Sequence, residues 1–490
     1  MNGKRLVAAL FPLLVACDPG PPVLPDPAAP PPVALPGKPA PAQAVQGIVK
    51  KLDEKVTALG GSVSAAFVRV GTGEILGAAN EHAPKNPASN AKLPTVAAAL
   101  ALLGPGHRFS TGLYGKADGA GHVPELVLRS HGDPTLRTED LAAMARELTT
   151  QSVTKVDKVL VDQSWFDDQY VPPAFDQQPN EWAYFRAPVA AVSLDENTVT
   201  IYVRTGAKGE RARITVDPPG FVDVEGFITT GKKSSADTTT CEMSANGDRL
   251  KATLGGKLAE GSRLYPIVKR VEDPRRLAGY ALVAVLREQG VEVGGEVALG
   301  GAKEKHALAT HASRPLLEIV DLCGKDSDNF VAEMLFRAVG EGTGKTTSTA
   351  DGARVVTDFL EARGALDGGK IVNGSGLFDA NRATAAGTTK LLAGVYGDPK
   401  VGPEFLAHLS IGGVDGTLKG RFEKWGDARV IRAKTGTLAG AVALSGYILS
   451  DEPGAPIAFS ILVNGINGKQ TDAKAAIDDA VDAVAALVWK

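Results

Sequence analysis

Apolar positions follow two different spacings along the chain, and each spacing predicts one kind of element. Apolar residues that recur every three or four positions predict amphipathic helices, and these stretches are 44–59, 91–103, 316–339, 350–363 and 472–489. Short apolar runs bounded by polar or turn residues predict strands, and these runs are 62–70, 74–79, 430–434, 441–449 and 456–463. A helix and a hairpin therefore open the fold, and three strands and a helix close it.

The two ends of the chain are predicted to form two halves of one sheet flanked by terminal helices. Between them, residues 108–306 carry many short β-like runs without a repeat period, which indicates an inserted region. We expect a discontinuous catalytic domain over 44–107 and 307–490, and an insertion of two nested domains whose inner one covers about 190–268. A chain of 490 residues is too long for one core, so several domains are expected. The predicted fold class is α+β.

The N-terminus has the pattern of an export signal. Two basic residues precede an apolar run over 6–16, which has the length of a signal h-region and is too short to span a bilayer. The run ends Leu-Val-Ala-Cys at Cys17, which resembles a bacterial lipobox. We predict a lipoprotein signal peptide over 1–16, a lipidated Cys17 and a Pro/Ala-rich tether over 17–43, which together describe an exported, periplasm-facing protein anchored to a bacterial membrane. Plain secretion with cleavage after Ala16 is the alternative.

Composition narrows the function classes. Charged residues make up 22% of the chain and its formal net charge is −3, so nothing favours a nucleic-acid partner. The chain has no H-E-x-x-H pattern or paired-cysteine spacing, so neither a metal nor a cofactor is expected. Residues 342–346 resemble part of a phosphate-binding loop, but the glycine spacing is wrong and the segment follows a helix. Cys241 and Cys323 either pair after export or remain ordinary unpaired thiols.

The first candidate catalytic string is Ser89-Asn90-Ala91-Lys92, at the start of a helical run. Residues three apart on a helix share a face, so the Lys92 amine can reach the Ser89 hydroxyl. A serine becomes a good nucleophile when a base takes its proton, and a lysine can do this when burial favours its neutral form. A lone S-x-x-K is usually an ordinary surface pair, and residues 152–155 repeat the pattern.

The second string, Ser327-Asp328-Asn329, falls on a loop between two helix-like segments. We expect Ser327 to relay a proton toward the leaving amine, and Asn329 to hold Lys92 and a substrate carbonyl. Taken alone, the string is more typical of a helix-capping loop in which Ser327 or Asp328 bonds helix amides.

The third string, Lys434-Thr435-Gly436-Thr437, is predicted to close a strand whose edge can pair with an extended peptide. We expect Lys434 and Thr435 to bind the terminal carboxylate of the substrate, with Gly436 beside them. The backbone N–H of Thr437, together with that of Ser89, is expected to form an oxyanion hole. Alone, K-T-G is more often a plain turn.

In this order the three strings resemble the signature of serine enzymes that react with D-alanyl-D-alanine peptides and penicillins. The gap of 238 positions between Ser89 and Ser327 resembles that of the low-molecular-mass class C penicillin-binding proteins, the peptidase S13 family, which insert domains there. Further strings similar to that family are 132–136, 187–188, 193–197, 373–377 and 413–418.

This resemblance implies a penicillin-binding, serine β-lactamase-like transpeptidase domain, with an antiparallel sheet between helices. It implies D-Ala-D-Ala carboxypeptidase or endopeptidase activity on peptidoglycan stem peptides, and covalent inhibition by β-lactams. The residues to which it assigns these roles are Ser89, Lys92, Ser327, Asn329, Lys434, Thr435 and Thr437. Two alternatives stay open: a non-catalytic lipoprotein that binds the cell wall or a divisome partner, and a β-lactamase. Chain length and the lack of a deacylating E-x-x-L-N element disfavour the β-lactamase.

One segment departs from the family. Phe378-Asp379 stand where many members have Ser-Arg, and Arg382 is the nearest arginine downstream. In some relatives that arginine holds the diaminopimelate side chain of the stem peptide, so the side-chain preference of this chain is open. Trp165 and Asp168 resemble the opposite wall of that pocket in some relatives, although a surface aromatic residue and a solvated aspartate explain them about as well.

Overall fold

The computed structural model describes residues 42–178, 181–340, 346–450 and 456–489. The predicted signal peptide, the predicted lipidation at Cys17 and nearly all of the predicted tether lie outside the described residues. Within the described ranges, no helix combines the length and apolarity that a membrane crossing requires.

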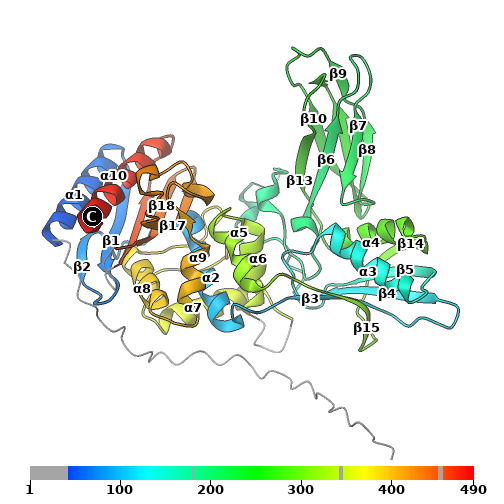
Figure 1. Ribbon diagram of the computed structural model, residues 1–490, viewed down its shortest axis with the longest axis horizontal. Coiled ribbons are helices and arrows are strands. Elements are labelled where there is room, and N and C mark those ends of the chain that lie inside the picture. The colour runs from blue at the N-terminus through cyan, green and yellow to red at the C-terminus, as the bar shows by residue number, and fades with distance from the viewer. Residues whose placement is uncertain (1–41, 179–180, 341–345, 451–455, 490) are drawn as a thin grey trace, which may run out of the picture.

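A six-stranded antiparallel sheet brings the two ends of the chain together, as the sequence predicts (Figure 1). Its strands in spatial order are β16 (Ser410–Ile411), β17 (Ile431–Leu438), β18 (Ala441–Ile448), β19 (Ile457–Asn464), β1 (Ser62–Arg69) and β2 (Ile75–Ala79). The N-terminal β1 pairs antiparallel with the C-terminal β19 along its whole length. All residues of β18 are buried, because helices cover both faces of the sheet at this position.

The terminal helices α1 (Ala42–Ala58) and α10 (Gln470–Val488) pack side by side against one face of the sheet (Figure 1). The apolar positions of α1 are spaced by three or four residues and are fully buried, with Val45, Val49 and Val56 at 0% exposure. Burial of each such side chain contributes about 1.5–3 kcal/mol, so the amphipathic pattern is enough to hold the helix on the sheet.

The opposite face of the sheet carries the helices that surround the candidate site. They are α2 (Lys92–Leu103), α5 (Leu316–Gly324), α6 (Asn329–Ala338), α7 (Thr349–Glu361), α8 (Ala385–Tyr396) and α9 (Gly402–His408). Their buried side chains form one apolar cluster that includes Tyr447 and Ala458 of the sheet. The predicted α+β class, with an antiparallel sheet between helices, is confirmed.

A second, five-stranded sheet lies beside this body (Figure 1). Its strands in spatial order are β14 (Glu292–Leu299), β5 (Lys155–Asp162), β4 (His122–Ser130), β3 (Ser110–Tyr114) and β15 (Ala307–Ala312), and the helices α3 (Thr138–Thr150) and α4 (Leu277–Glu288) pack against it. Residues 307–312 were expected in the catalytic segment, but β15 pairs with β3 of this second sheet. A single short strand carries no information about its partner, so the sequence pattern could not assign this segment to the second sheet.

A set of short strands projects from the second sheet as an elongated arm (Figure 1). They are β6 (Thr198–Arg204), β7 (Arg213–Asp217), β8 (Val222–Gly226), β9 (Thr229–Gly231), β10 (Thr240–Asn246), β11 (Arg249–Gly255), β12 (Lys257–Ala259) and β13 (Tyr265–Arg270). Cys241 lies on β10 and Cys323 is buried in α5, and both thiols are free. The disulfide that the sequence left open therefore does not form between them.

Candidate active site

Ser89 lies in a single 3₁₀ turn, η1 (Ala88–Ala91), and Lys92 is the first residue of α2. The sequence analysis placed Ser89 at the start of the α-helical run, and the structure differs by this one turn. In a 3₁₀ turn residues i and i+3 eclipse each other, which brings Lys92 Nζ to 3.1 Å from Ser89 Oγ. The predicted neighbourhood of nucleophile and base is therefore present, and Pro94 is accommodated because it lies in the first turn of α2.

Lys92 is 1% exposed, and its Nζ lies 2.6 Å from Asn329 Oδ1 and 2.9 Å from the backbone oxygen of Ser375. Burial lowers the pKa of Lys92 to about 8, although nearby acidic groups oppose the shift. A neutral amine has two N–H donors and one lone pair. When Lys92 is neutral and donates to Asn329 and Ser375, its lone pair can accept from the Ser89 hydroxyl, whereas the protonated amine donates to Ser89 Oγ.

A buried carboxylate, Glu333 on α6, holds the segment that provides this Ser375 oxygen. Glu333 accepts hydrogen bonds from the backbone nitrogens of Gly374 (3.1 Å) and Ser375 (2.8 Å). Gly376 then has φ +74°, and a Cβ there would lie 1.9 Å from the Ala88 oxygen. Only glycine combines this backbone conformation with such close approach, so Gly376 lets the 373–376 segment pack directly against the turn that holds Ser89.

The Ser327-Asp328-Asn329 string connects α5 and α6. Its geometry is compatible both with a helix-capping loop and with a part of the candidate site. The Asp328 side chain caps α6 by accepting from Val331 N at 2.8 Å. The same turn places Ser327 at φ +61° and directs Asn329 toward the candidate nucleophile. The Asn329 amide is fixed from both sides, because its Nδ2 donates to the Phe185 oxygen at 2.9 Å.

Lys434 to Thr437 lie in the C-terminal half of β17, which ends one residue later at Leu438, so the string closes a strand as predicted, although this strand extends beyond the predicted range 430–434. The ladder with β18 extends to Leu438 and keeps these residues extended. Gly436 is needed at this position, because a Cβ would lie 2.9 Å from the Pro87 oxygen and 3.1 Å from Ser89 N. Strand β17 therefore passes directly beside the 3₁₀ turn of Ser89.

Lys434 is fully buried, and its Nζ donates to Ser327 Oγ at 2.8 Å and to the Thr435 oxygen at 2.9 Å. Burial, and secondly the positive charge of Lys92, keep the pKa of Lys434 well below its ordinary value. Two buried ammonium groups at one site repel each other, which disfavours protonation of Lys434. The negative charge of an incoming carboxylate would offset this repulsion and favour protonation of Lys434. The Thr435 hydroxyl is 2.9 Å from Thr417 Oγ1.

Asn90 was not singled out from the sequence, yet it ties the nucleophile turn to the strand. It is 4% exposed, and its amide nitrogen lies 2.9 Å from the Lys434 oxygen while its oxygen lies 2.6 Å from Ser445 Oγ. These bonds connect η1 with β17 and β18, so the distance between Ser89 and the K-T-G string is fixed by buried polar contacts.

A cleft of about 740 Å³ opens over these groups. The described residues that line it are Asn86, Ser89, Gln178, Phe185, Ser327, Asn329, Leu377, Phe378, Asp379, Arg382, Thr437, Leu438, Ala439, Gly440, Ala441 and Asn464. Three motifs that are distant in sequence thus meet in one cavity. Lys92 and Lys434 lie beneath the surface of the cleft, where they contact the lining residues Ser89 and Ser327.

Of the predicted substrate-binding residues, Thr437 lines this cleft, whereas Thr435, Gly436, Trp165 and Asp168 do not. The Trp165 ring packs against His131 with ring centroids 4.2 Å apart, and Asp168 is exposed. Their neighbour Asp167 instead pairs with the buried Arg337 at 3.0 Å. The sequence could not show that these residues lie away from the cleft, because the cleft forms only when distant segments pack together.

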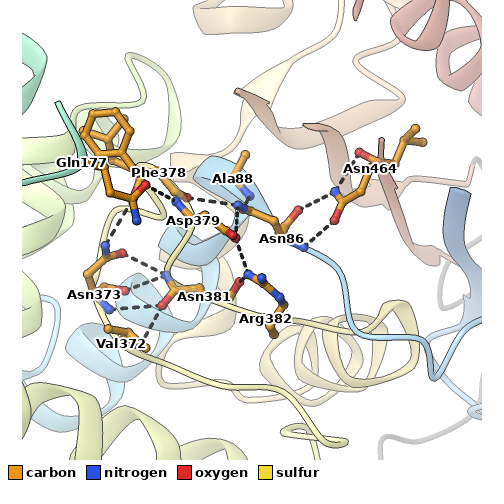
Figure 2. A network of polar contacts seen from close by, with 12 residues as sticks. Asn86, Ala88, Gln177, Val372, Asn373, Phe378, Asp379, Asn381, Arg382 and Asn464 are labelled. Atoms are coloured by element: carbon orange, nitrogen blue, oxygen red, sulfur yellow. Dashed lines mark hydrogen bonds and ion pairs between the residues drawn. The ribbon is translucent and has the colours of Figure 1, made fainter. Parts of the chain in front are cut away.

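The departing segment contributes Phe378, Asp379 and Arg382 to the lining of the cleft. Figure 2 shows the polar contacts of this segment. Asn86 donates to the Phe378 oxygen at 3.1 Å and to Asp379 Oδ1 at 3.2 Å, and Asp379 pairs with Arg382 at 2.6 Å. Asn464 bonds the backbone of Asn86 on the other side. An ion pair, and not a lone arginine, therefore lines this part of the cleft.

Glu333 and Phe185 were also missed in the sequence analysis. Glu333 follows Asn329 by four positions in α6, where it is one of two charged residues among buried, mostly apolar ones, and a buried acid in such a helix was a usable signal. Phe185 lies more than 140 positions before Asn329, and its contribution is a backbone oxygen, which no sequence pattern could reveal.

Comparison with known proteins agrees with this geometry. The family model described as D-Ala-D-Ala carboxypeptidase 3 (S13) family matches residues 45–488. A D-alanyl-D-alanine carboxypeptidase of Actinomadura sp. (strain R39) is 33% identical over 445 residues, covering 86% of this chain and 81% of that protein. The carboxypeptidase DacB of Haemophilus influenzae is 27% identical, covering 79% of this chain and 82% of that protein.

A solved structure extends the agreement from sequence to fold. The crystal structure of penicillin binding protein 4 (dacB) from Haemophilus influenzae has a TM-score of 0.71 to this chain at 25% identity, and covers 86% of this chain and 93% of its own. The similarity of fold thus extends over most of the chain. On the motifs, the geometry and these matches together, the chain belongs to the D-Ala-D-Ala carboxypeptidase 3 (S13) family.

Proposed function

We propose that this protein is a serine D-Ala-D-Ala carboxypeptidase that acts on peptidoglycan stem peptides and is acylated by β-lactams. The observation that carries the proposal is the position of Lys92 Nζ, 3.1 Å from Ser89 Oγ and hydrogen-bonded to Asn329. Family membership and the related carboxypeptidases support the same reaction. Endopeptidase action on cross-linked peptides is the same chemistry with a larger leaving amine.

In the proposed acylation, Ser89 Oγ attacks the penultimate D-Ala carbonyl while its proton passes to the neutral amine of Lys92. The oxyanion forms near the backbone nitrogens of Ser89 and Thr437, and loss of one such donor typically costs about 3 kcal/mol of transition-state stabilisation. Ser327, bonded to Lys434 Nζ, then delivers a proton to the departing amine as the C–N bond breaks. Ser327 recovers a proton from Lys434 Nζ. Water then attacks the ester and returns a proton to Lys434 through Ser327, while the departing Ser89 oxygen takes its proton back from Lys92, so that every group is restored.

Substrate recognition is proposed to use the free edge of β17. The short β16 pairs only with Arg432 and Ala433, so the part of β17 from Lys434 to Leu438 has no described strand partner on that side. An extended peptide can add to such an edge by main-chain hydrogen bonds. The terminal carboxylate would then lie near Lys434 and Thr435.

We also propose that the protein is an exported lipoprotein held at a bacterial membrane through Cys17. The basic residues before the apolar run and the Leu-Val-Ala-Cys ending support this proposal. Mass spectrometry of the mature N-terminus should find an acylated Cys17, and Cys17→Ser should release the protein from membranes. A mature N-terminus without lipid would refute lipidation.

Covalent labelling by a fluorescent penicillin tests the proposed activity. The wild type should be labelled and should release D-Ala from a stem-peptide mimic, whereas Ser89→Ala should do neither. Labelling of Ser89→Ala would refute the assignment of the nucleophile. A wild type that binds no penicillin and releases no D-Ala would indicate a non-catalytic binding protein, and rapid turnover of a cephalosporin would indicate a β-lactamase.

A further inference from the structure

The string at residues 413–418 resembles a recurring string of the family but has no role in the proposed reaction. It forms a loop that follows β16 and includes the short 3₁₀ turn η6 (Gly416–Leu418). Within this loop, Thr417 is exposed and its Oγ1 lies 2.9 Å from Thr435 Oγ1. The loop therefore contacts the hydroxyl group that is proposed to recognise the terminal carboxylate of the substrate.

Backbone and ion-pair contacts hold Thr417 at this position. Its N–H donates to the Lys325 oxygen at 3.1 Å and to Ser410 Oγ at 3.2 Å. Two residues earlier, Asp415 pairs with Lys325 Nζ at 2.7 Å and accepts from Ile411 N at 2.7 Å. None of these contacts uses the Thr417 hydroxyl, so the loop keeps its place whichever partner that hydroxyl bonds.

Three hydroxyl groups form a chain from this loop to β17. Ser410 Oγ lies 3.3 Å from the Gly324 oxygen and 3.3 Å from Thr417 Oγ1, which in turn lies 2.9 Å from Thr435 Oγ1. Each hydroxyl has one proton and can accept two bonds, so the chain permits two directions of donation. In one, Thr435 donates to Thr417, and Ser410 donates to Gly324. In the other, Ser410 donates to Thr417, and Thr417 donates to Thr435.

Only the second direction suits a bound carboxylate. Thr435 is half-buried and stands two positions before Thr437, which lines the cleft, so the two side chains leave β17 on the same side. A carboxylate only accepts hydrogen bonds, so Thr435 must turn its proton toward it and can no longer donate to Thr417. When Thr417 donates to Thr435 instead, the bonds of the chain polarise one another, and the bond from Thr435 to the carboxylate becomes stronger.

We propose that Thr417 is a positioning residue for recognition of the terminal carboxylate, and that it donates to Thr435 Oγ1 so that the Thr435 proton points at the carboxylate. The inference rests on the proposed function and adds to it a residue outside the three motifs. Thr417 touches no substrate and acts through Thr435. A substrate without a carboxylate makes less use of the Thr435 proton, so Thr417 contributes less to its reaction.

The preference for a carboxylate can be measured directly. It is the ratio of the second-order rate constants for acylation by penicillin G and by its methyl ester, each obtained at constant pH by competition with a fluorescent penicillin. Thr417→Val keeps the shape of the side chain and removes its hydroxyl. Its rate constant for penicillin G should fall about fivefold, which is the effect of about one neutral hydrogen bond. Its rate constant for the ester should change less than twofold.

Two variants complete the experiment. Thr417→Ser retains the hydroxyl and should keep the wild-type ratio. Thr253→Val is the matched control, because Thr253 is exposed on β11 of the arm, and it should leave both rate constants unchanged. If Thr417→Val does not fold, Thr417→Ala removes the same hydroxyl without adding a methyl group in its place and decides in its stead.

Equal losses of both rate constants in Thr417→Val would indicate a merely structural role and would overturn the inference, as would an unchanged ratio. Failure of the proposed function gives a different result, namely a wild type that reacts with neither penicillin G nor the fluorescent penicillin. That result would overturn the function and the inference together, whereas a reactive wild type with an unaffected Thr417→Val overturns the inference alone.

Discussion

The pH dependence of acylation follows directly from the surroundings of Lys92. Only the neutral amine can take the Ser89 proton, and burial lowers the pKa of Lys92 to about 8. With that pKa, about 9% of the enzyme has a neutral Lys92 at pH 7, about half at pH 8 and about 91% at pH 9. The rate constant for acylation should therefore rise about tenfold from pH 7 to pH 9 and change about tenfold per pH unit below pH 7.

Replacement of Lys92 by arginine gives the matching perturbation at constant pH. A guanidinium stays protonated over this whole range, so Lys92→Arg keeps the charge and loses the base. Loss of a positioned general base typically costs about 10²- to 10⁴-fold in rate. Lys51→Arg, on the exposed side of α1, is the control and should leave the rate constant unchanged.

Stopped-flow or gel-based labelling with an excess of fluorescent penicillin measures both effects as a second-order rate constant. A rate constant that is flat between pH 6.5 and 8.5 would refute the assignment of Lys92 as the base. Retention of more than a tenth of the wild-type rate by Lys92→Arg would refute it independently.

Three further predictions concern packing, specificity and acid stability. Gly376→Ala should lose at least about 2 kcal/mol of unfolding free energy and most of its penicillin labelling, because its φ is +74° and its Cβ would strike the Ala88 oxygen. Its control is Gly394→Ala on α8, where a Cβ meets nothing within 4 Å. This variant should be more stable than the wild type by up to about 1 kcal/mol in urea unfolding. Arg382→Ala leaves the exposed Asp379 carboxylate without its ion pair, so kcat/KM for stem peptides with a cationic side chain should rise up to about fivefold relative to neutral ones. Asp379→Asn should reverse this preference. The same ratio of kcat/KM for cationic and neutral peptides in both variants would exclude a role of the pair in specificity. His408 is buried, and burial lowers its pKa to about 3, so the folded state binds fewer protons than the unfolded one. Stability is therefore lost as pH falls below about 6.5. The unfolding free energy measured in urea should fall less between pH 7 and pH 5 for His408→Leu than for the wild type, by at most about 1.4 kcal/mol per pH unit.

The local sequence was sufficient for much of the fold. The apolar spacing of α1 and α10 and the apolar runs of β1 and β17 to β19 predicted their elements within a few residues. The local sequence was sufficient because each of these elements buries one continuous face, and the spacing of its apolar residues indicates which face is buried. For β15 the pattern predicted neither its partner nor its sheet, because pairing depends on segments that are distant along the chain.

The candidate site divides in the same way. The motifs named the groups that are proposed to carry out the chemistry, because the proposed base, Lys92, must stand at a fixed spacing from its serine. The supporting contacts were not predictable: Glu333, Asn90 and the Phe185 oxygen reach the site through bonds between segments up to several hundred residues apart. Trp165 illustrates the opposite error, since a residue type that suits a binding pocket faces His131.

By itself, the sequence determined the order of the helices and strands and the identity of the three strings that meet at Ser89. Only the tertiary structure decided the protonation and orientation of those groups. The pKa of Lys92 depends on how deeply it is buried, and the direction of its lone pair depends on where Asn329 and Ser375 place their oxygens. Both are properties of the packed interior, because desolvation and hydrogen-bond geometry exist only once distant segments have come together.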